Sequence, residues 1–529
     1  MWINGWRKQA WAQLDQEWDI LIIGGGITGT GILRQAVQEG YKTLLVEAAD
    51  FSSGTSSRSS KLIHGGFRYL RNKQFNVTRE SVREREWLLK EARDLVTPLG
   101  FLMPCPHDPK VARQYGIGVI IYDLLAPKWQ HSRLSRTEML KRSPELESEE
   151  LTGGYLYYDA AMDDARLVFR LIREAAAGGG TALNYTRATR LLKDAQGDVC
   201  GAVLSDRSPV GLGEKEVTAR VVINATGPWS DELRAEVGAP ARIRKLRGSH
   251  LVFSRERLPL KRAVTLIHPR DHRAMFAIPW EGVSLIGTTD LDHTFPLADC
   301  EPFCTAAEIN YILEAANDTF PALELEQTDV LSTFSGLRPI INTGQADPSK
   351  ESRAHVVWQE HGLITITGGK YTTFRIMAEQ ALQMASSRLP HPADLSARKK
   401  YFDSLPRERM SIELPEDTHS YLIGRYGQET AALLAATAVD ENKPIRNLPN
   451  IWSELRWAAR TGAVEHLDDL LLRRVRLGML LPDAARADLD RIGEIVRSEL
   501  DWDAQRWQAE VARYLEIYHK AYSPAPAGC

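Results

Sequence analysis

The segment from residue 19 to residue 47 restricts the fold of this chain more than any other. It begins with DILII (19–23), a short apolar run that ends in glycines and is typical of a buried parallel strand. The apolar residues between 32 and 37 keep a helical spacing, and Gly40 stands where a helix C-cap would fall. TLLVE (43–47) then has the character of a second strand. The segment therefore predicts a βαβ unit.

The turn between the first strand and the helix has the pattern G-x-G-x-x-G. Gly24 permits the tight turn, Gly26 lets the backbone approach a pyrophosphate, and Gly29 lets helix and strand pack closely. A carboxylate at Glu47, where the second strand ends, can bind the ribose hydroxyls of an adenosine. We therefore expect a dinucleotide site, with FAD and NAD both open. Its expected residues are Gly24, Gly26, Ile27, Thr28, Gly29 and Glu47.

The next segment, SSGTSSRSSKLIHGGFRYLR (52–71), is dense in hydroxyl, glycine and basic residues. Its hydroxyls and main-chain amides are suited to wrap a second phosphate and a ring system, which favours FAD. The alternative is a plain surface loop.

Two later apolar runs predict returns to the same sheet. They are ARVVINATG (219–227) and GLITITGG (362–369), and both end in glycine. Between them, residues 240–335 alternate polar and apolar side chains with turn residues, which predicts a mostly antiparallel sheet. After about residue 390 the periodicity becomes helical. We therefore expect an α/β fold with a Rossmann-like nucleotide-binding domain, interrupted by a β-sheet cap and followed by an all-helical domain.

Bulk properties exclude several classes of protein. A chain of 529 residues is expected to form two or three domains, and its net charge of −3 gives no bias toward nucleic acid. The five cysteines are too scattered for a disulfide framework or a metal set, so we expect unpaired thiols in a reducing compartment and no metal. The sequence lacks an apolar run long enough to span a membrane.

Nine short motifs occur in order along the chain and, taken together, are specific. They are GGGITGTGI, TSSRSSKLIHGGFRYL, DDARLV (163–168), INATGPW (223–229), RGSHLV (247–252), IPW (278–280), IGTTD (286–290), SGLRPI (335–340) and GGKYTTFR (368–375). This series resembles the FAD-dependent glycerol-3-phosphate dehydrogenase family, which includes oxidase relatives. The resemblance runs from about residue 18 to 380, and LDDLLLRRVRLG (467–478) resembles the family's additional domain.

The resemblance implies FAD between a Rossmann-like FAD-binding domain and a substrate cap. The FAD-binding domain would comprise residues 18–100, 150–240 and 335–390, the cap 101–149 and 241–334, and the helical domain 391–529. The additional residues implied to line FAD are Ser56, Ser57, Ser59, Lys61, Leu62, Gly65, Gly66, Ala225, Thr226, Gly227, Gly369, Lys370 and Thr372. Those implied to surround glycerol 3-phosphate are Arg68, Tyr69, Arg338, Arg353 and Lys370.

The implied reaction moves a hydride from C2 of the substrate to FAD N5, and His64, Arg338 and Lys370 are the candidate catalytic residues. Histidine has an ordinary pKa of about 6.5 and suits a base near neutral pH. Arginine remains protonated, so Arg338 suits the stabilisation of a developing alkoxide. We therefore interpret His64 as the proton acceptor, and the assignment of that role to Arg338 stays open.

Membrane quinone is the electron acceptor that we expect, because the surplus segment carried by the family's oxidases is absent between residues 290 and 335. An oxidase that reduces oxygen to hydrogen peroxide is the alternative, and a flavin-bound scaffold without turnover is a third. A homodimer is left open.

The apolar stretch YGIGVIIYDLLAPKW (115–129) has lysine and arginine at its borders. In the family's dehydrogenases this place carries a segment that dips into the membrane, so we expect a cytoplasmic protein held peripherally at the inner face of the cell membrane. A core helix is the alternative. For the tryptophans near the N-terminus we favour packing on the body over an interfacial anchor.

Overall fold

The structure is a computed structural model of the chain. It describes all residues except 1, 4, 67–74, 107, 126–130, 298–300, 346–350, 352–353, 396–399, 407–413, 437–438 and 526–529.

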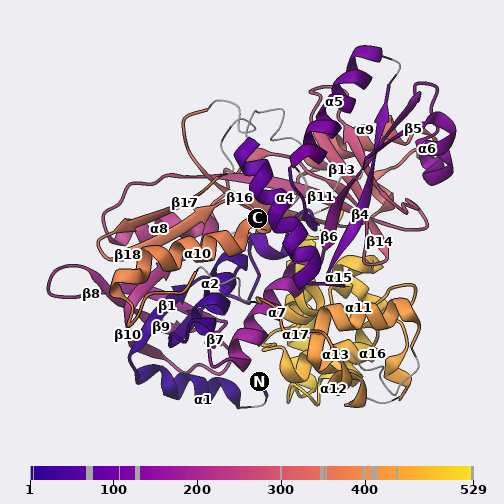
Figure 1. The fold of residues 1–529 in the computed structure, drawn as a ribbon. Helices are drawn as coiled ribbons and strands as arrows, with labels where there is room; N and C mark the ends of the chain where they lie inside the picture. The colour runs from indigo at the N-terminus through magenta and orange to yellow at the C-terminus, as the bar shows by residue number, and fades with distance from the viewer. Residues whose placement is uncertain are drawn as a thin grey trace.

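One layer of the molecule is an eight-stranded sheet (Figure 1). Its main path runs through β17 (His355–Glu360), β18 (Leu363–Gly368), β10 (Glu214–Asn224), β1 (Trp18–Ile23), β2 (Thr43–Val46) and β7 (Thr181–Leu183). The pairs from β18 to β7 are parallel, and β8 (Thr186–Lys193) and β9 (Val199–Asp206) extend β10 as an antiparallel ribbon. Three helices pack together on this sheet, namely α2 (Ile27–Gln38), α7 (Asp164–Ala177) and α10 (Phe374–Ala385). Ile20, Leu21 and Ile22 of β1 are fully buried, as the uninterrupted apolar run predicts.

The second layer is a ten-stranded sheet that forms the cap. Its path is β15 (Leu291–Asp292), β11 (Ile243–Ser254), β14 (Val283–Gly287), β13 (Ala274–Trp280), β12 (Ala263–Ile267), β4 (Val96–Cys105), β6 (Gly153–Met162) and β3 (Leu62–Ile63). β16 (Val330–Ile341) pairs with β11, and β5 (Ser132–Ser135) pairs with β6. All of these pairs are antiparallel except β12 with β4. The α/β fold with a mostly antiparallel cap is confirmed.

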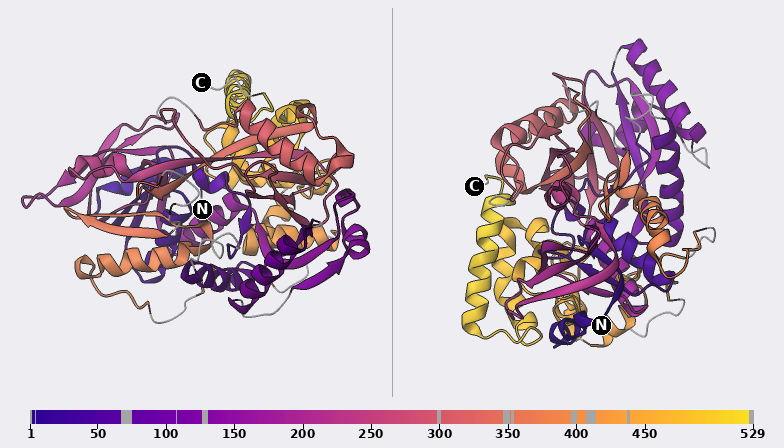
Figure 2. Two further views of the ribbon diagram at one scale, coloured as in Figure 1. Left: turned by 90° about the horizontal axis from the view of Figure 1, so that it is seen from above. Right: turned by 90° about the vertical axis from the view of Figure 1, so that its left-hand side faces the viewer.

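The C-terminal region is helical, as predicted. Its main helices are α11 (Glu416–Tyr426), α12 (Thr430–Ala435), α13 (Ser453–Thr461), α16 (Leu489–Val496) and α17 (Ala504–Ala521). They lie in yellow and orange along one side of the molecule (Figure 2). Leu470 and Leu477 share one apolar cluster with Trp280 and Phe334 of the cap. The helical region therefore completes the core beneath the cap sheet.

Strands of the cap sheet extend into the ranges that we expected for the FAD-binding domain. β6 falls in the range 150–240 assigned to the FAD-binding domain, yet it pairs with β4 along its whole length in the cap sheet. β16 extends past residue 335 and pairs with β11 in the cap sheet as well. The chain passes from β6 directly into α7, so no linker or change of composition marks the crossing.

The N-terminal tryptophans pack on the body, as we favoured. Trp2, Trp11 and Trp18 are buried, and Trp2 stacks on Phe51 with 5.5 Å between ring centroids. Within the described ranges, the helices are all too short or too polar to cross a membrane.

The cysteines that the structure describes are Cys105, Cys200 and Cys304, and all three are free thiols. Cys300 and Cys529 lie outside the described residues.

Candidate active site

The turn from β1 into α2 requires its glycines for steric reasons. Gly24 has a φ of +119°, and a Cβ there would lie 2.5 Å from the carbonyl oxygen of Ala225. A Cβ on Gly29 would lie 1.9 Å from the carbonyl oxygen of Gly24. The turn thus brings the N-terminus of α2 close to the neighbouring strand ends, where its N–H groups favour a bound anion.

Glu47 is fixed at the carboxyl end of β2. Its Oε2 accepts a hydrogen bond from the Gly25 amide at 2.7 Å, and its Oε1 accepts one from the Ala49 amide at 3.0 Å. Burial raises the pKa of Glu47, although these main-chain bonds act in the opposite direction. The carboxylate therefore stands beside the glycine turn, where a ribose hydroxyl of a dinucleotide would donate to it.

A cavity of about 1810 Å³ opens where the carboxyl ends of four parallel strands meet. Gly24 follows β1, Glu47 follows β2, Ala225 follows β10, and Gly369 follows β18, and all four residues line the cavity. This is the edge at which sheets of this kind bind their ligands. The volume exceeds the roughly 300–1,000 Å³ of an ordinary small-molecule pocket, so it suits a dinucleotide and a substrate together.

The structure brings most of the expected site residues to this one cavity. Those that line it are Gly24, Gly26, Ile27, Thr28, Glu47, Ser56, Ser59, Leu62, His64, Gly66, Ala225, Thr226, Gly227, Arg338, Gly369, Lys370 and Thr372. Four others lie behind its wall, namely Gly29, Ser57, Lys61 and Gly65. Arg68, Tyr69 and Arg353 lie outside the described residues.

Lys61 supports the expected flavin-binding segment from behind. Its Nζ donates to the carbonyl oxygen of Ser57 at 2.6 Å and to Oδ2 of Asp164 at 2.8 Å, and its side chain is fully buried. Burial lowers the pKa of Lys61 to about 7, while Asp164 opposes that shift. Ser59 Oγ donates to the same carboxylate at 2.7 Å. Lys61 thus stabilises the segment from behind, and its ammonium group does not face the cavity.

The helical domain holds this segment as well. Arg476 Nη1 donates to the carbonyl oxygen of Ser57 at 3.1 Å, and Arg476 Nη2 donates to Asp163 at 2.9 Å and also to Asp164. Sequence reasoning missed this role, although Asp163, Asp164 and Arg476 all stand in motifs that carried the resemblance.

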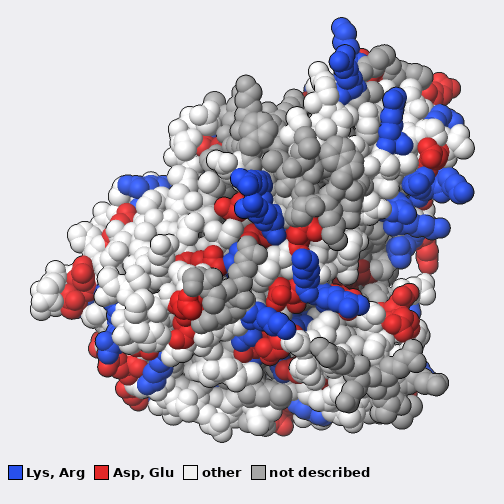
Figure 3. All heavy atoms as spheres, viewed as in Figure 1, with Lys and Arg blue, Asp and Glu red and all other residues white. Residues whose placement is uncertain are grey.

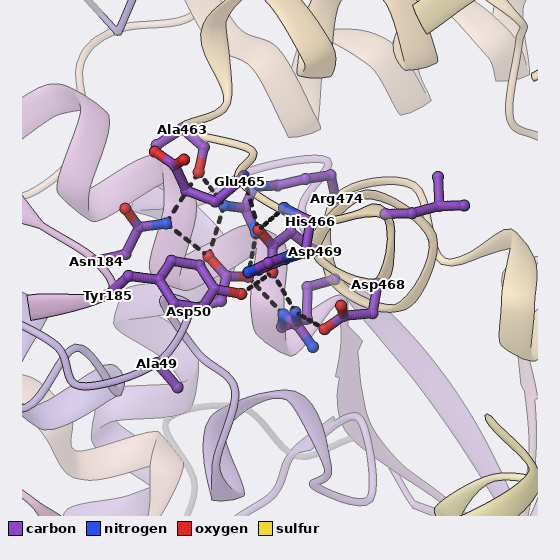
Figure 4. Close-up of polar contacts among 12 residues, drawn as sticks. Ala49, Asp50, Asn184, Tyr185, Ala463, Glu465, His466, Asp468, Asp469 and Arg474 are labelled. Atoms are coloured by element: carbon purple, nitrogen blue, oxygen red, sulfur yellow. Dashed lines mark hydrogen bonds and ion pairs between the residues drawn. The ribbon is translucent and has the colours of Figure 1, made fainter. Parts of the chain in front are cut away.

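A second contact of the helical domain reaches Asp50, three residues after Glu47 (Figure 4). Arg474 Nη2 donates to Asp50 Oδ1 at 2.8 Å, and Arg473 Nε donates to Oδ2 at 2.5 Å. Asn184 Nδ2 donates to the same carboxylate at 3.0 Å. Burial opposes ionisation, but the two guanidinium groups outweigh it and hold the pKa of Asp50 at about 2. The adenosine end of the expected site is therefore braced by a buried ion network.

The candidate catalytic groups His64, Arg338 and Lys370 line the same cavity. Burial, and then the positive charge of Lys370, lower the pKa of His64 to about 4, with a further contribution from Arg338. His250 also lines the cavity, stacked on Phe334 with 4.6 Å between ring centroids and hydrogen-bonded to Ser60 at 2.9 Å. The arrangement combines an imidazole that can accept a proton with two side chains that can hold an anion.

The sequence profile of FAD dependent oxidoreductases matches residues 19–375, and that of the C-terminal domain of alpha-glycerophosphate oxidase matches residues 364–507. "Glycerol-3-phosphate dehydrogenase 2" of Mycobacterium tuberculosis is 36% identical over 535 residues, covering 96% of this chain and 89% of that protein. This chain belongs to the FAD-dependent glycerol-3-phosphate dehydrogenase family. The "aerobic glycerol-3-phosphate dehydrogenase" of Staphylococcus aureus is 31% identical and covers 97% of this chain and 96% of its own.

A solved structure agrees with membership of the glycerol-3-phosphate dehydrogenase family. The glycerol-3-phosphate dehydrogenase of Bacillus halodurans, complexed with FAD, superimposes with a TM-score of 0.78 at 28% identity over 100% of both chains. An L-alpha-glycerophosphate oxidase from Mycoplasma pneumoniae shares the fold, with a TM-score of 0.57 at 19% identity over 72% of this chain and 98% of its own. FAD is therefore the cofactor of this protein, and the glycine turn, Glu47 and the size of the cavity fit it.

Proposed function

We propose that this protein oxidises sn-glycerol 3-phosphate to dihydroxyacetone phosphate and passes the electrons to membrane quinone. The observation that carries the proposal is that two groups of residues line one cavity. The turn at Gly24 and the carboxylate of Glu47 line it, and so do His64, Arg338 and Lys370. Bound FAD would supply the acceptor for the hydride from C2. The chain's own residues then have to bind a phosphate dianion and remove a hydroxyl proton.

Arg338 and Lys370 supply the charge that the phosphate or the developing alkoxide needs. A guanidinium group grips an anionic oxygen in a bidentate manner, and Lys370 adds a second positive charge. Phosphate specificity follows, because glycerol offers no anion to these cations.

His64 is the group that we propose as proton acceptor. It is uncharged at neutral pH because burial and the positive charge of Lys370 lower its pKa to about 4. A bound phosphate dianion offsets the charges of Lys370 and Arg338 and raises the proton affinity of the imidazole. Substrate binding would thereby strengthen the base at the moment when it is needed.

Quinone as acceptor is supported by an apolar part of the same cavity. Met103, Ile117, Ile121 and Phe276 line the cavity on the side of α5 (Pro109–Leu125). A quinone head group is uncharged and partitions with apolar side chains, so this wall suits it. The oxidase alternative draws on the profile match at residues 364–507, whose description names an oxidase.

α5 is also the surface that we propose for reversible membrane binding. Val119 and Tyr122 are buried in the cap core, whereas Ile117 and Ile120 are 50% and 41% exposed. The helix lies at the tip of the cap, and Lys and Arg side chains gather over that tip (Figures 1 and 3). An apolar face beside basic residues suits an anionic lipid surface.

Two assays test the proposal. Enzyme reduced by glycerol 3-phosphate under anaerobic conditions is mixed with a soluble quinone or with oxygen; rapid reoxidation by quinone is expected, and reoxidation by oxygen alone favours the oxidase. Separately, wild type should sediment with anionic liposomes, and Ile117→Glu with Ile120→Glu should reduce the bound fraction. Val210→Glu, at a side chain that is 44% exposed on the β9–β10 ribbon, is the matched control. Equal sedimentation of all variants would refute binding through α5.

A further inference from the structure

The segment Thr288-Thr289-Asp290 contacts the guanidinium group of Arg338 at three acceptors. Arg338 Nη1 donates to Asp290 Oδ1 at 2.9 Å and to the Thr289 carbonyl oxygen at 3.1 Å. Arg338 Nη2 donates to Thr288 Oγ1 at 3.0 Å. The acceptors come from three successive residues and meet both terminal nitrogens, so they fix the orientation of the group as well as its position.

The segment that supplies these acceptors is itself firmly held. Thr289 Oγ1 accepts from the Ser249 amide at 2.9 Å and donates to Glu308 at 2.8 Å. Glu308 is in turn buried in an ion pair with Arg247 at 2.9 Å. The Asp290 side chain has no solvent exposure, whereas that of Arg338 is 29% exposed and lines the cavity. A rigid, buried carboxylate thus holds a guanidinium group that remains accessible from the cavity.

Asp290 also faces a second guanidinium group. Arg273 Nη2 lies 3.3 Å from Asp290 Oδ2, and Arg273 lines the same cavity. Two cations therefore share one carboxylate, and the site keeps a net positive charge toward a substrate anion. Strand β11 leaves room for this arrangement, because a Cβ on Gly248 would lie 2.4 Å from Arg338 Nη2.

We infer that Asp290, together with Thr288, is a positioning device that orients Arg338 for the reaction. The inference rests on the proposed function, in which Arg338 stabilises negative charge on the substrate. Removing Asp290 leaves the positive charge of Arg338 near the cavity but releases its orientation. Orientation matters more for the transition state than for ground-state binding, so kcat should fall more than the KM for glycerol 3-phosphate changes.

The test is a double-mutant cycle on the FAD-loaded protein. Asp290→Ala is expected to lower kcat at least about tenfold and to leave KM within about threefold of the wild-type value. A loss of this size is typical when a catalytic group is misaligned. In an Arg338→Lys background the same substitution should change kcat by less than about twofold, because its effect passes through Arg338. Thr288→Val, a milder change, should follow the same pattern with a smaller loss. Asp290→Asn keeps an oxygen acceptor for Arg338 and should recover most of the turnover.

Other outcomes would overturn the inference. If Asp290→Ala and Thr288→Val both turn over like wild type while Arg338→Lys does not, the positioning role fails and the proposed function stands. If Arg338→Lys itself is fully active, the role of Arg338 in the proposed function fails and the positioning role fails with it. An Asp290→Ala loss that persists with Arg338→Lys and disappears with Arg273→Ala would assign the carboxylate to Arg273 instead.

Discussion

Arg476, in the helical domain, donates a hydrogen bond to the main-chain carbonyl oxygen of Ser57, 3.1 Å away and 419 residues earlier in the chain. The helical domain therefore supports the segment that lines the flavin site, in addition to completing the core below the cap. Arg476 is buried between Asp163 and Asp164, and both of these carboxylates are buried as well. We therefore expect the contact to link the retention of cofactor to a domain whose described residues do not line the cavity.

Arg476→Met should weaken FAD binding. Met keeps the apolar bulk but removes the donor to Ser57 and leaves two buried carboxylates short of a partner. We expect the dissociation constant for FAD to rise about tenfold or more, which corresponds to about 1.4 kcal/mol. Reconstitution of apoprotein, followed by quenching of flavin fluorescence, measures it. Arg456→Met is the matched control, since Arg456 pairs with Glu441 and Glu499 within the helical domain. Equal affinities in the two variants would contradict the role of Arg476.

Asp50→Asn should destabilise the protein in a pH-dependent way. At pH 7 the change removes the carboxylate that Arg474 pairs with, whereas Arg473 keeps its ion pairs with Asp468 and Asp469. Leaving the buried Arg474 without its counter-charge should cost about 3–5 kcal/mol. The pKa of Asp50 is lowered to about 2, so its contribution is present above its unfolded value of about 4 and is lost as pH falls through 2. The difference in free energy of unfolding between wild type and variant, measured with urea, should therefore stay constant from pH 7 to about pH 5 and narrow as pH falls from about 4 toward 2.

The control for Asp50 is Glu516→Gln, which removes an exposed pair with Lys520. Both side chains of that pair are exposed to solvent, so it should contribute far less than a buried pair. If Asp50→Asn lowers the free energy of unfolding no more than this control does, the network in Figure 4 does not stabilise the site.

Gly29→Ala should give a protein that purifies without flavin. Its Cβ would lie 1.9 Å from the carbonyl oxygen of Gly24, so the turn that faces the pyrophosphate has to open. Gly197→Ala is the comparison, because Gly197 has a φ of +86° but nothing within 4 Å of an added Cβ. Absorbance of the purified proteins gives the flavin content directly. A yellow Gly29→Ala protein with a full complement of FAD would show that the turn tolerates the methyl group.

The pH dependence of turnover should show no titration step at the ordinary pKa of a histidine, about 6.5. Because the pKa of His64 is lowered to about 4, the imidazole is unprotonated throughout the range above that value. The substrate phosphate gains its second charge near pH 6, and that step sets the acid limb of kcat/KM. After division by the fraction of dianion, kcat/KM should be flat down to about pH 5. A remaining step between pH 6 and 7 that vanishes in His64→Asn would contradict the assignment.

Local features of the fold were predictable because they depend on residues close in sequence. The βαβ unit needs only a buried strand, a glycine turn and an amphipathic helix, and all three lie between residues 19 and 47. The positions of Glu47, Ala225 and Gly369 follow from it, because the carboxyl ends of neighbouring parallel strands meet at one edge.

The parts of the fold and of the site that were not predictable from sequence depend on contacts between distant segments. Nothing in the run around Lys61 indicates that its ammonium group faces Asp164 behind the cavity wall. The ion pair between Arg273 and Asp290 likewise forms only because the cap sheet places β13, β14, β11 and β16 side by side. The domain boundary at β6 was misplaced for the same reason, since pairing partners are set by the folded sheet.

The most direct test of the account is anaerobic mixing of the FAD-loaded protein with sn-glycerol 3-phosphate while the flavin absorbance is recorded. The account predicts rapid bleaching by sn-glycerol 3-phosphate, no bleaching by glycerol at the same concentration, and a rate lowered at least about tenfold in Arg338→Lys, because lysine cannot reproduce the bidentate grip. A flavin that stays oxidised with sn-glycerol 3-phosphate, or that is reduced equally well by glycerol, would contradict it.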